Sequence, residues 1–117
     1  MVETYYANIE ADVVSNPAYR RVMYTDPYLQ LVYMSLKPTE EIEMEIHAVT
    51  QFFRIESGNG VAIIDGISYE LGDGTSFIVP AGHQHYVRNT SSTNALKLYT
   101  IYAPPQHDPY TYQLTKP

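Results

Sequence analysis

Short runs of apolar residues, several alternating with polar ones, dominate the chain from about residue 20 onward. They are rich in β-branched and aromatic side chains, and no segment carries a helical period over three turns. The runs are "QLVYMSL" (30–36), "IEMEIH" (42–47), "QFFRIE" (51–56), "VAIID" (61–65), "ISYEL" (67–71), "SFIVP" (76–80), "HYVRN" (85–89) and "ALKLYTIY" (95–102). This pattern predicts an all-β protein.

Turn signals separate these runs. "KPTEE" follows the first run, "SGNG" supplies two glycines, and Asp65-Gly66 between two apolar runs is a strong hairpin signal. "LGDGT" (71–75) and "PAG" (80–82) complete the set. Short strands at this spacing predict a sandwich or a small barrel.

The chain has 117 residues, which predicts one domain. Residues 1–20 have a weak pattern and are expected to form an N-terminal arm, and residues 21–102 are expected to form the β-barrel domain. Residues 103–117, "APPQHDPYTYQLTKP", are rich in proline. They are expected to form a C-terminal tail that runs over the surface without regular structure.

Charge and composition argue against several classes of partner. The formal net charge is −6 and no basic cluster is present, so nucleic acid and membranes are not expected partners. The apolar runs are too short to span a bilayer. The absence of cysteine and of an evident signal peptide leads us to expect a cytoplasmic protein.

Polar side chains stand in positions where a β protein usually places its core. Glu45 and His47 are two residues apart and therefore share a strand face, while Gln51 opens the next strand. If the faces agree, these three side chains and His85 converge inside one end of the barrel. Four nitrogen or oxygen donors around one point suit a divalent first-row metal. The alternative is a packed histidine beside a solvated glutamate.

Two longer spacings resemble the motifs of the cupin superfamily. The first cupin motif reads G-x5-H-x-H-x3or4-E-x6-G, and Glu45-x-His47-x3-Gln51-x6-Gly58 follows its spacing. The second reads G-x5-P-x-G-x2-H-x3-N, and this chain matches it at Gly74, Pro80, Gly82, His85 and Asn89. The resemblance covers roughly residues 29–102. "LKLYTIYAPPQH" and "QFFRIESGNG" are similar to small single-domain cupins often labelled mannose-6-phosphate isomerase-like.

The resemblance implies a double-stranded β-helix, that is, a jelly-roll barrel, often a homodimer. It implies a site in which His47 and His85 match two of the family's metal-binding histidines. Glu45 stands in place of the other histidine, Gln51 in place of the glutamate, and Thr39 in place of the opening glycine. The ligand set keeps a charge of −1, because the carboxylate has moved from position 51 to position 45. More oxygen in the set disfavours Cu and suits Mn, Fe, Co, Ni or Zn.

Other side chains are candidates for chemistry around the metal. His83 and Tyr86 are candidates for proton transfer, although His83 also reads as a turn residue in "PAGHQH". Candidates for the pocket wall are Tyr33, Phe53 and Tyr99. Arg54 is expected to face away from the pocket, Asn89 to bind backbone, and His107 to be an exposed bystander.

The first functional hypothesis is a metal-dependent enzyme acting on a small polar metabolite. It would isomerise a sugar or keto acid, or open the ring of an unsaturated uronate. The second is an Fe(II)-dependent dioxygenase with the same ligands. The third is a module that binds a small molecule or a metal without turnover.

Overall fold

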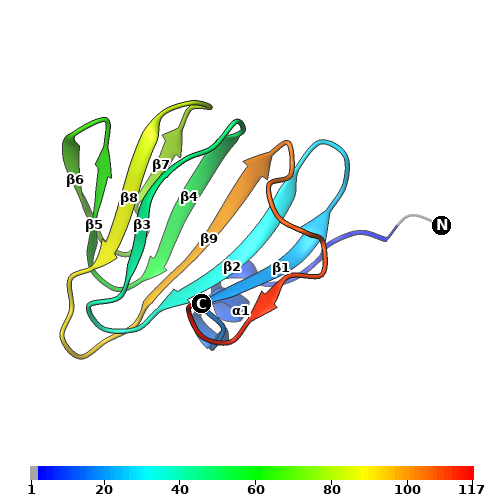
Figure 1. The fold of residues 1–117 in the computed structure, drawn as a ribbon. Coiled ribbons are helices and arrows are strands. Elements are labelled where there is room, and N and C mark those ends of the chain that lie inside the picture. Colours follow the sequence, from blue (N-terminus) through cyan, green and yellow to red (C-terminus); the bar gives the residue numbers. More distant parts are fainter. Residues whose placement is uncertain (1–2) are drawn as a thin grey trace.

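The computed structural model describes residues 3–117 (Figure 1). One helix, α1 (Ile9–Ser15), precedes a series of strands. The strands are β1 (Arg20–Thr25), β2 (Gln30–Leu36), β3 (Glu41–Ile46), β4 (Thr50–Ser57), β5 (Gly60–Ile64), β6 (Ile67–Leu71), β7 (Ser76–Val79), β8 (Gln84–Asn89), β9 (Leu96–Ala103) and β10 (Tyr112–Gln113). The predicted runs between 30 and 102 all become strands.

The strands form two antiparallel sheets. The larger has the order β10-β1-β2-β9-β4-β7 and the smaller β3-β8-β5-β6. The smaller sheet lies against the β4 and β7 side of the larger one, as Figure 1 shows. This is the single-domain jelly roll predicted from the sequence, and that prediction is confirmed.

The interior is apolar at one end and polar at the other. In the pairing of β2 with β9, Leu36 lies opposite Leu96, and both side chains are completely buried. At the other end of the same ladder, Gln30 lies opposite Tyr102, and the pairing of β4 with β9 sets Gln51 opposite Tyr102 as well. The apolar end supplies most of the hydrophobic stabilisation, which leaves the polar end free for chemistry.

Helix α1 covers the outer face of the larger sheet. Val13 of the helix packs with Leu31 and Tyr33, which alternate with the interior residues of β2. The helix has seven residues, so it is too short to show a helical period over three turns in the sequence. Among residues 3–117, no helix is long and apolar enough to cross a bilayer.

The C-terminal tail is more ordered than the sequence indicated. Its strand β10 pairs with β1, with Gln113 opposite Arg20 and Tyr112 opposite Arg21. The backbone of His107 is also held, because its N–H donates to Oε1 of Gln30 and its carbonyl accepts from Nε2 of Gln30. The expectation of a tail without regular structure was therefore wrong.

The turn between β2 and β3 places a β-branched residue in the left-handed region. Thr39, which replaces the glycine of the family motif, has a φ of 67°. We expect Thr39→Gly to raise the free energy of unfolding by about 0.5–1 kcal/mol, because strain is relieved at some cost in chain entropy. Urea denaturation measures this. Thr90→Gly, at a loop position without positive φ, should lower stability. Equal losses in both variants would contradict the account.

Candidate metal centre

A β-bulge in β3 orients the first candidate ligand. The pairing of β3 with β8 passes from Ile42 opposite Val87 to Glu45 opposite His85, so β3 contains one extra residue there. Ile42 and Glu45 consequently both face the interior, although they are three residues apart. Without the bulge, alternation from Ile42 would turn Met44 inward, whereas Met44 is 52% exposed.

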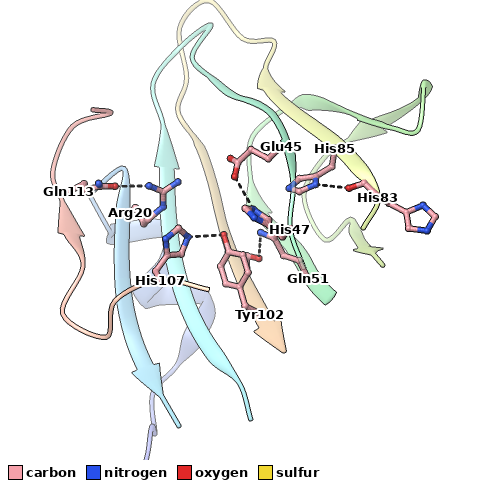
Figure 2. Close-up of polar contacts among 10 residues, drawn as sticks. Arg20, Glu45, His47, Gln51, His83, His85, Tyr102, His107 and Gln113 are labelled. Atoms are coloured by element: carbon pink, nitrogen blue, oxygen red, sulfur yellow. Dashed lines mark hydrogen bonds and ion pairs between the residues drawn. The ribbon is translucent and has the colours of Figure 1, made fainter. Parts of the chain in front are cut away.

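The side chains of Glu45, His47 and His85 converge at this point (Figure 2). Oε2 of Glu45 lies 2.8 Å from Nε2 of His47, and one donor atom from each residue lies within 4.8 Å of the other two. Two ligands at about 2.1 Å from one ion are at most about 4.2 Å apart. Small side-chain movements would therefore bring all three onto one ion, and the three residues form a candidate metal site.

The protonation states of the site favour a cation. Burial alone would raise the pKa of Glu45, but the hydrogen bond and charge of His47 lower it below its usual value, with smaller contributions from His85 and Arg20. Burial lowers the pKa of His85, which is 1% exposed. Near neutral pH the site therefore offers a carboxylate and an imidazole lone pair, which are the forms that bind metals.

Gln51 contributes a buried oxygen that has no partner. Its Nε2 donates to Oγ1 of Thr100 over 2.9 Å, whereas its Oε1 accepts no hydrogen bond from the residues described. Tyr102 connects this carboxamide to the other candidate ligands. It lies opposite Gln51 in the ladder, and its ring meets the His47 ring edge-on at 5.7 Å. A buried acceptor without a donor costs about 1–3 kcal/mol, which a bound cation would offset.

Three more residues contribute polar groups to this end of the interior: Arg20 from the first strand, Tyr102 from β9 and His107 from the C-terminal tail. Nε2 of His107 lies 3.2 Å from the hydroxyl oxygen of Tyr102, and Arg20 reaches toward the same region from β1 (Figure 2). Burial raises the pKa of Tyr102, which stays protonated. Burial, followed by the charge of Arg20, lowers the pKa of His107 to about 4, so its ring is neutral near pH 7. Sequence reasoning missed all three residues.

Comparison with known protein families agrees with this geometry. The cupin domain family Cupin_2 matches residues 32–102, which is more than half of the chain. The chain is a cupin. The matched segment runs from β2 to β9 and contains all four candidate ligands.

Relatives of this cupin extend the similarity beyond the matched domain. Protein L612 of Acanthamoeba polyphaga mimivirus is 41% identical, over 98% of this chain and 74% of its own length. YrkC of Bacillus subtilis is 39% identical over 96% of this chain, which spans only 63% of YrkC. The crystal structure of BH2720 from Bacillus halodurans superposes with a TM-score of 0.91 and 38% identity, covering 95% of this chain and 89% of that one. None of these names states an activity.

The two residues expected to transfer protons point away from the centre. His83 precedes β8, so strand alternation does not apply to it, and its exposed ring pairs with Asp65 while its carbonyl oxygen lies 3.4 Å from Nδ1 of His85. Tyr86 is adjacent to His85 in β8 and therefore faces outward, where its hydroxyl donates to Glu41. Both placements correct the sequence-based expectation.

Two of the three residues expected to line the pocket lie on the outer face of the larger sheet instead of the interior face. Tyr33 and Tyr99 belong to the cluster under helix α1, because the interior positions of their strands are occupied by their neighbours. Phe53 does face the interior. It stacks on Phe77 with centroids 4.6 Å apart and meets the His85 ring at 6.1 Å.

The structure also shows the surroundings of Asn89, Arg54 and His107, for which the sequence made predictions. Asn89 is fully buried and its Nδ2 donates to the carbonyls of Leu36, Lys37 and Asn94, so its predicted backbone role is confirmed. Arg54 faces away from the site and pairs with Glu56 at 2.9 Å, as predicted. His107 is not the exposed bystander that was expected, since it is half-buried against Tyr102.

The neutral His107 predicts a pH-dependent stability. Between pH 6.5 and about 4 the unfolded chain holds a proton on this ring that the folded chain does not, so stability falls as pH falls through that window. We expect a loss on the order of 2 kcal/mol from His107, with His85 acting in the same direction. Urea denaturation of metal-free protein should show a shallower fall for His107→Gln. Parallel curves for the two proteins would contradict the prediction.

Proposed function

We propose that this cupin is a metal-dependent enzyme that acts on a small polar metabolite. Glu45, His47, Gln51 and His85 would hold one divalent ion of Mn, Fe, Co, Ni or Zn. The observation that carries the proposal is the partnerless buried oxygen of Gln51, next to a cluster of ionised and neutral ligands. A divalent ion held there would polarise a carbonyl or hydroxyl oxygen of the substrate.

The chain's own residues can hold and move a proton beside that ion. The Tyr102 hydroxyl remains protonated and can donate to a substrate oxygen, while the neutral His107 ring, within hydrogen-bond distance of it, can accept a proton from the substrate. This pair replaces His83 and Tyr86 as the candidate for proton transfer. Moving a proton from the carbon next to a carbonyl and returning it elsewhere isomerises a sugar or a keto acid, and related chemistry opens an unsaturated uronate ring.

Exchange of substrate hydrogen with solvent tests this proposal. The protein is loaded with each metal in D2O and incubated with aldose and ketose phosphates, including mannose 6-phosphate, with 2-oxo acids and with unsaturated uronates. Proton NMR should show loss of a C–H signal that depends on metal. Tyr102→Phe should slow exchange by about 10²–10⁴-fold. Tyr99→Phe, which changes a tyrosine on the outer face, should leave the rate unchanged.

Other outcomes would favour the other two hypotheses. Oxygen consumption by the Fe(II)-loaded protein, without exchange in the absence of O2, would replace the proposal with a dioxygenase. Ligand-induced shifts in the protein's own NMR spectrum, with neither exchange nor oxygen use across the panel, would replace it with a non-catalytic binding protein.

The homodimer and the cytoplasmic location stay predictions. Light scattering after size-exclusion chromatography tests the first, because a dimer has twice the chain mass of 13.3 kDa. A mass equal to one chain across the concentration range of the assay would contradict the dimer.

A further inference from the structure

Two adjacent arginines at the start of β1 have opposite surroundings. Arg20 lies opposite Met34, an interior residue that is 1% exposed, so its side chain faces the inside of the barrel. Arg21 lies opposite Tyr33 on the outer face and is exposed, with its guanidinium 5.8 Å from the centre of the Tyr112 ring. Of the two arginines, Arg20 is therefore the one that directs its charge toward the polar end of the interior, where Figure 2 shows it beside His107.

Uncharged groups hold Arg20 in place. Nη1 donates to Oε1 of Gln113 over 2.7 Å, and the guanidinium lies 5.2 Å from the centre of the Tyr19 ring. Its Nε is buried and donates to no acceptor in the part of the chain that the structure describes. A buried N–H of a charged group is costly to leave without an acceptor.

The nearby carboxylates are already paired. Glu45 contacts His47 at 2.8 Å, and Glu43 contacts Lys116 at 3.3 Å. Within residues 3–117, no carboxylate forms a salt bridge with Arg20. The structure therefore holds a fixed guanidinium whose natural partner, an anion, does not come from these residues.

A surface hollow gives such an anion a place to bind. It has a volume of about 240 Å³, and its lining residues are Tyr19, Arg20, Glu43, Met44, Glu45, Lys116 and Pro117. Glu45 belongs both to this hollow and to the candidate metal centre. A volume this small suits a metabolite of a few carbon atoms rather than a drug-sized ligand.

We propose that Arg20 binds the carboxylate or phosphate group of a small acidic substrate, whose remaining oxygens lie toward Glu45, the residue that the hollow shares with the candidate metal centre. A guanidinium fork matches both anions and orients them through parallel N–H donors. The substrate class of the proposed enzyme is thereby narrowed to small organic acids or phosphate esters. This inference rests on the proposed function for its substrate role, whereas the anion contact itself can be measured without metal.

The Nε–H of Arg20 provides a direct readout of the contact. Its ¹⁵N resonance is assigned by its loss in Arg20→Gln. Protein is titrated, before and after loading with diamagnetic Zn²⁺, with three ligands on one three-carbon skeleton, which are glycerate, glycerol 3-phosphate and glycerol. We expect a saturable downfield shift of the Nε–H with at least one of the two anions and none with glycerol. Which anion shifts it tells the two chemistries apart.

Matched variants test whether anion binding depends on the Arg20 guanidinium itself or only on positive charge in this region. Arg20→Gln should weaken binding of the anion by about 10–100-fold, since charge-assisted hydrogen bonds are lost. Arg20→Lys should recover part of the loss, because it restores the charge without the fork. Arg21→Gln removes the same charge from the outer face and should leave binding unchanged.

The outcomes distinguish the two proposals from each other. An unmoved Nε–H with both anions in both forms of the protein would overturn the role of Arg20. Equal losses in Arg20→Gln and Arg21→Gln, or glycerol binding as tightly as the anions, would overturn it too. If the protein takes up no metal but still binds the anion through Arg20, the role of Arg20 as an anion site stands. The proposal of a metal-dependent enzyme is then refuted.

Discussion

Glu45→Gln is expected to lower the affinity for a divalent metal by about 10²-fold or more. Glu45 is the one carboxylate among the candidate ligands, and its loss leaves a neutral set. A structural zinc site of four ligands is worth about 10–16 kcal/mol, or roughly 3 kcal/mol for each ligand, and 1.4 kcal/mol is a factor of ten. Competition with a chromophoric chelator measures the change. Unchanged affinity would reduce Glu45 to an ion-pair partner of His47.

A second substitution tests whether position 51 reaches the same ion. Gln51 stands where cupins of the family motif have a glutamate, so Glu45→Gln combined with Gln51→Glu restores one carboxylate on the other side of the site. We expect this double variant to recover affinity to within about tenfold of the natural chain. If the double variant binds as weakly as Glu45→Gln alone, Gln51 is a packing residue and the ligand set is smaller than proposed.

His85→Leu is expected to change stability in opposite directions with and without metal. Without metal, the substitution removes a buried polar ring whose charged form is disfavoured, beside the apolar Phe53 and in a strand with Val87. We expect the metal-free variant to gain about 1 kcal/mol. Metal at a thousand times its dissociation constant adds about 4 kcal/mol to the natural chain. The variant should not receive this gain, so the order of the two melting temperatures reverses.

The control for this reversal is another histidine of the same segment. His83→Gln changes an exposed ring paired with Asp65 and should keep the full stabilisation by metal. Thermal melts in chelator and in excess Zn²⁺ or Mn²⁺ provide the comparison. His85→Leu gaining as much stability from metal as His83→Gln would show that His85 is not a ligand.

Alternation and motif spacing were sufficient for the fold and for the centre of the site. Glu45 and His47 contact each other at 2.8 Å, as their spacing predicted, although His47 lies just beyond the end of β3. Alternation could also have corrected the choice of Tyr99 as a pocket-wall residue. Tyr99 lies one residue before Thr100 and therefore faces opposite to it, while Tyr102 shares the interior face with Thr100. The correct tyrosine could have been chosen from this pattern.

The remaining errors come from contacts between distant parts of the chain. Arg20 and His107 approach the site because Gln113 pairs with Arg20 and Gln30 holds the backbone of His107. Neither contact follows from local spacing, since the partners are far apart in sequence. The bulge that lets both Ile42 and Glu45 face inward also has no local signal, because it depends on the register with β8.

Elemental analysis of protein purified without added metal or chelator tests the central claim most directly. The natural chain is measured beside a His47→Ala/His85→Ala double variant that is shown to be folded. We predict close to one Mn, Fe, Co, Ni or Zn per chain in the first and none in the second. No metal in either protein, with no stabilisation when any of these ions is added, would contradict the claim and leave a metal-free polar pocket.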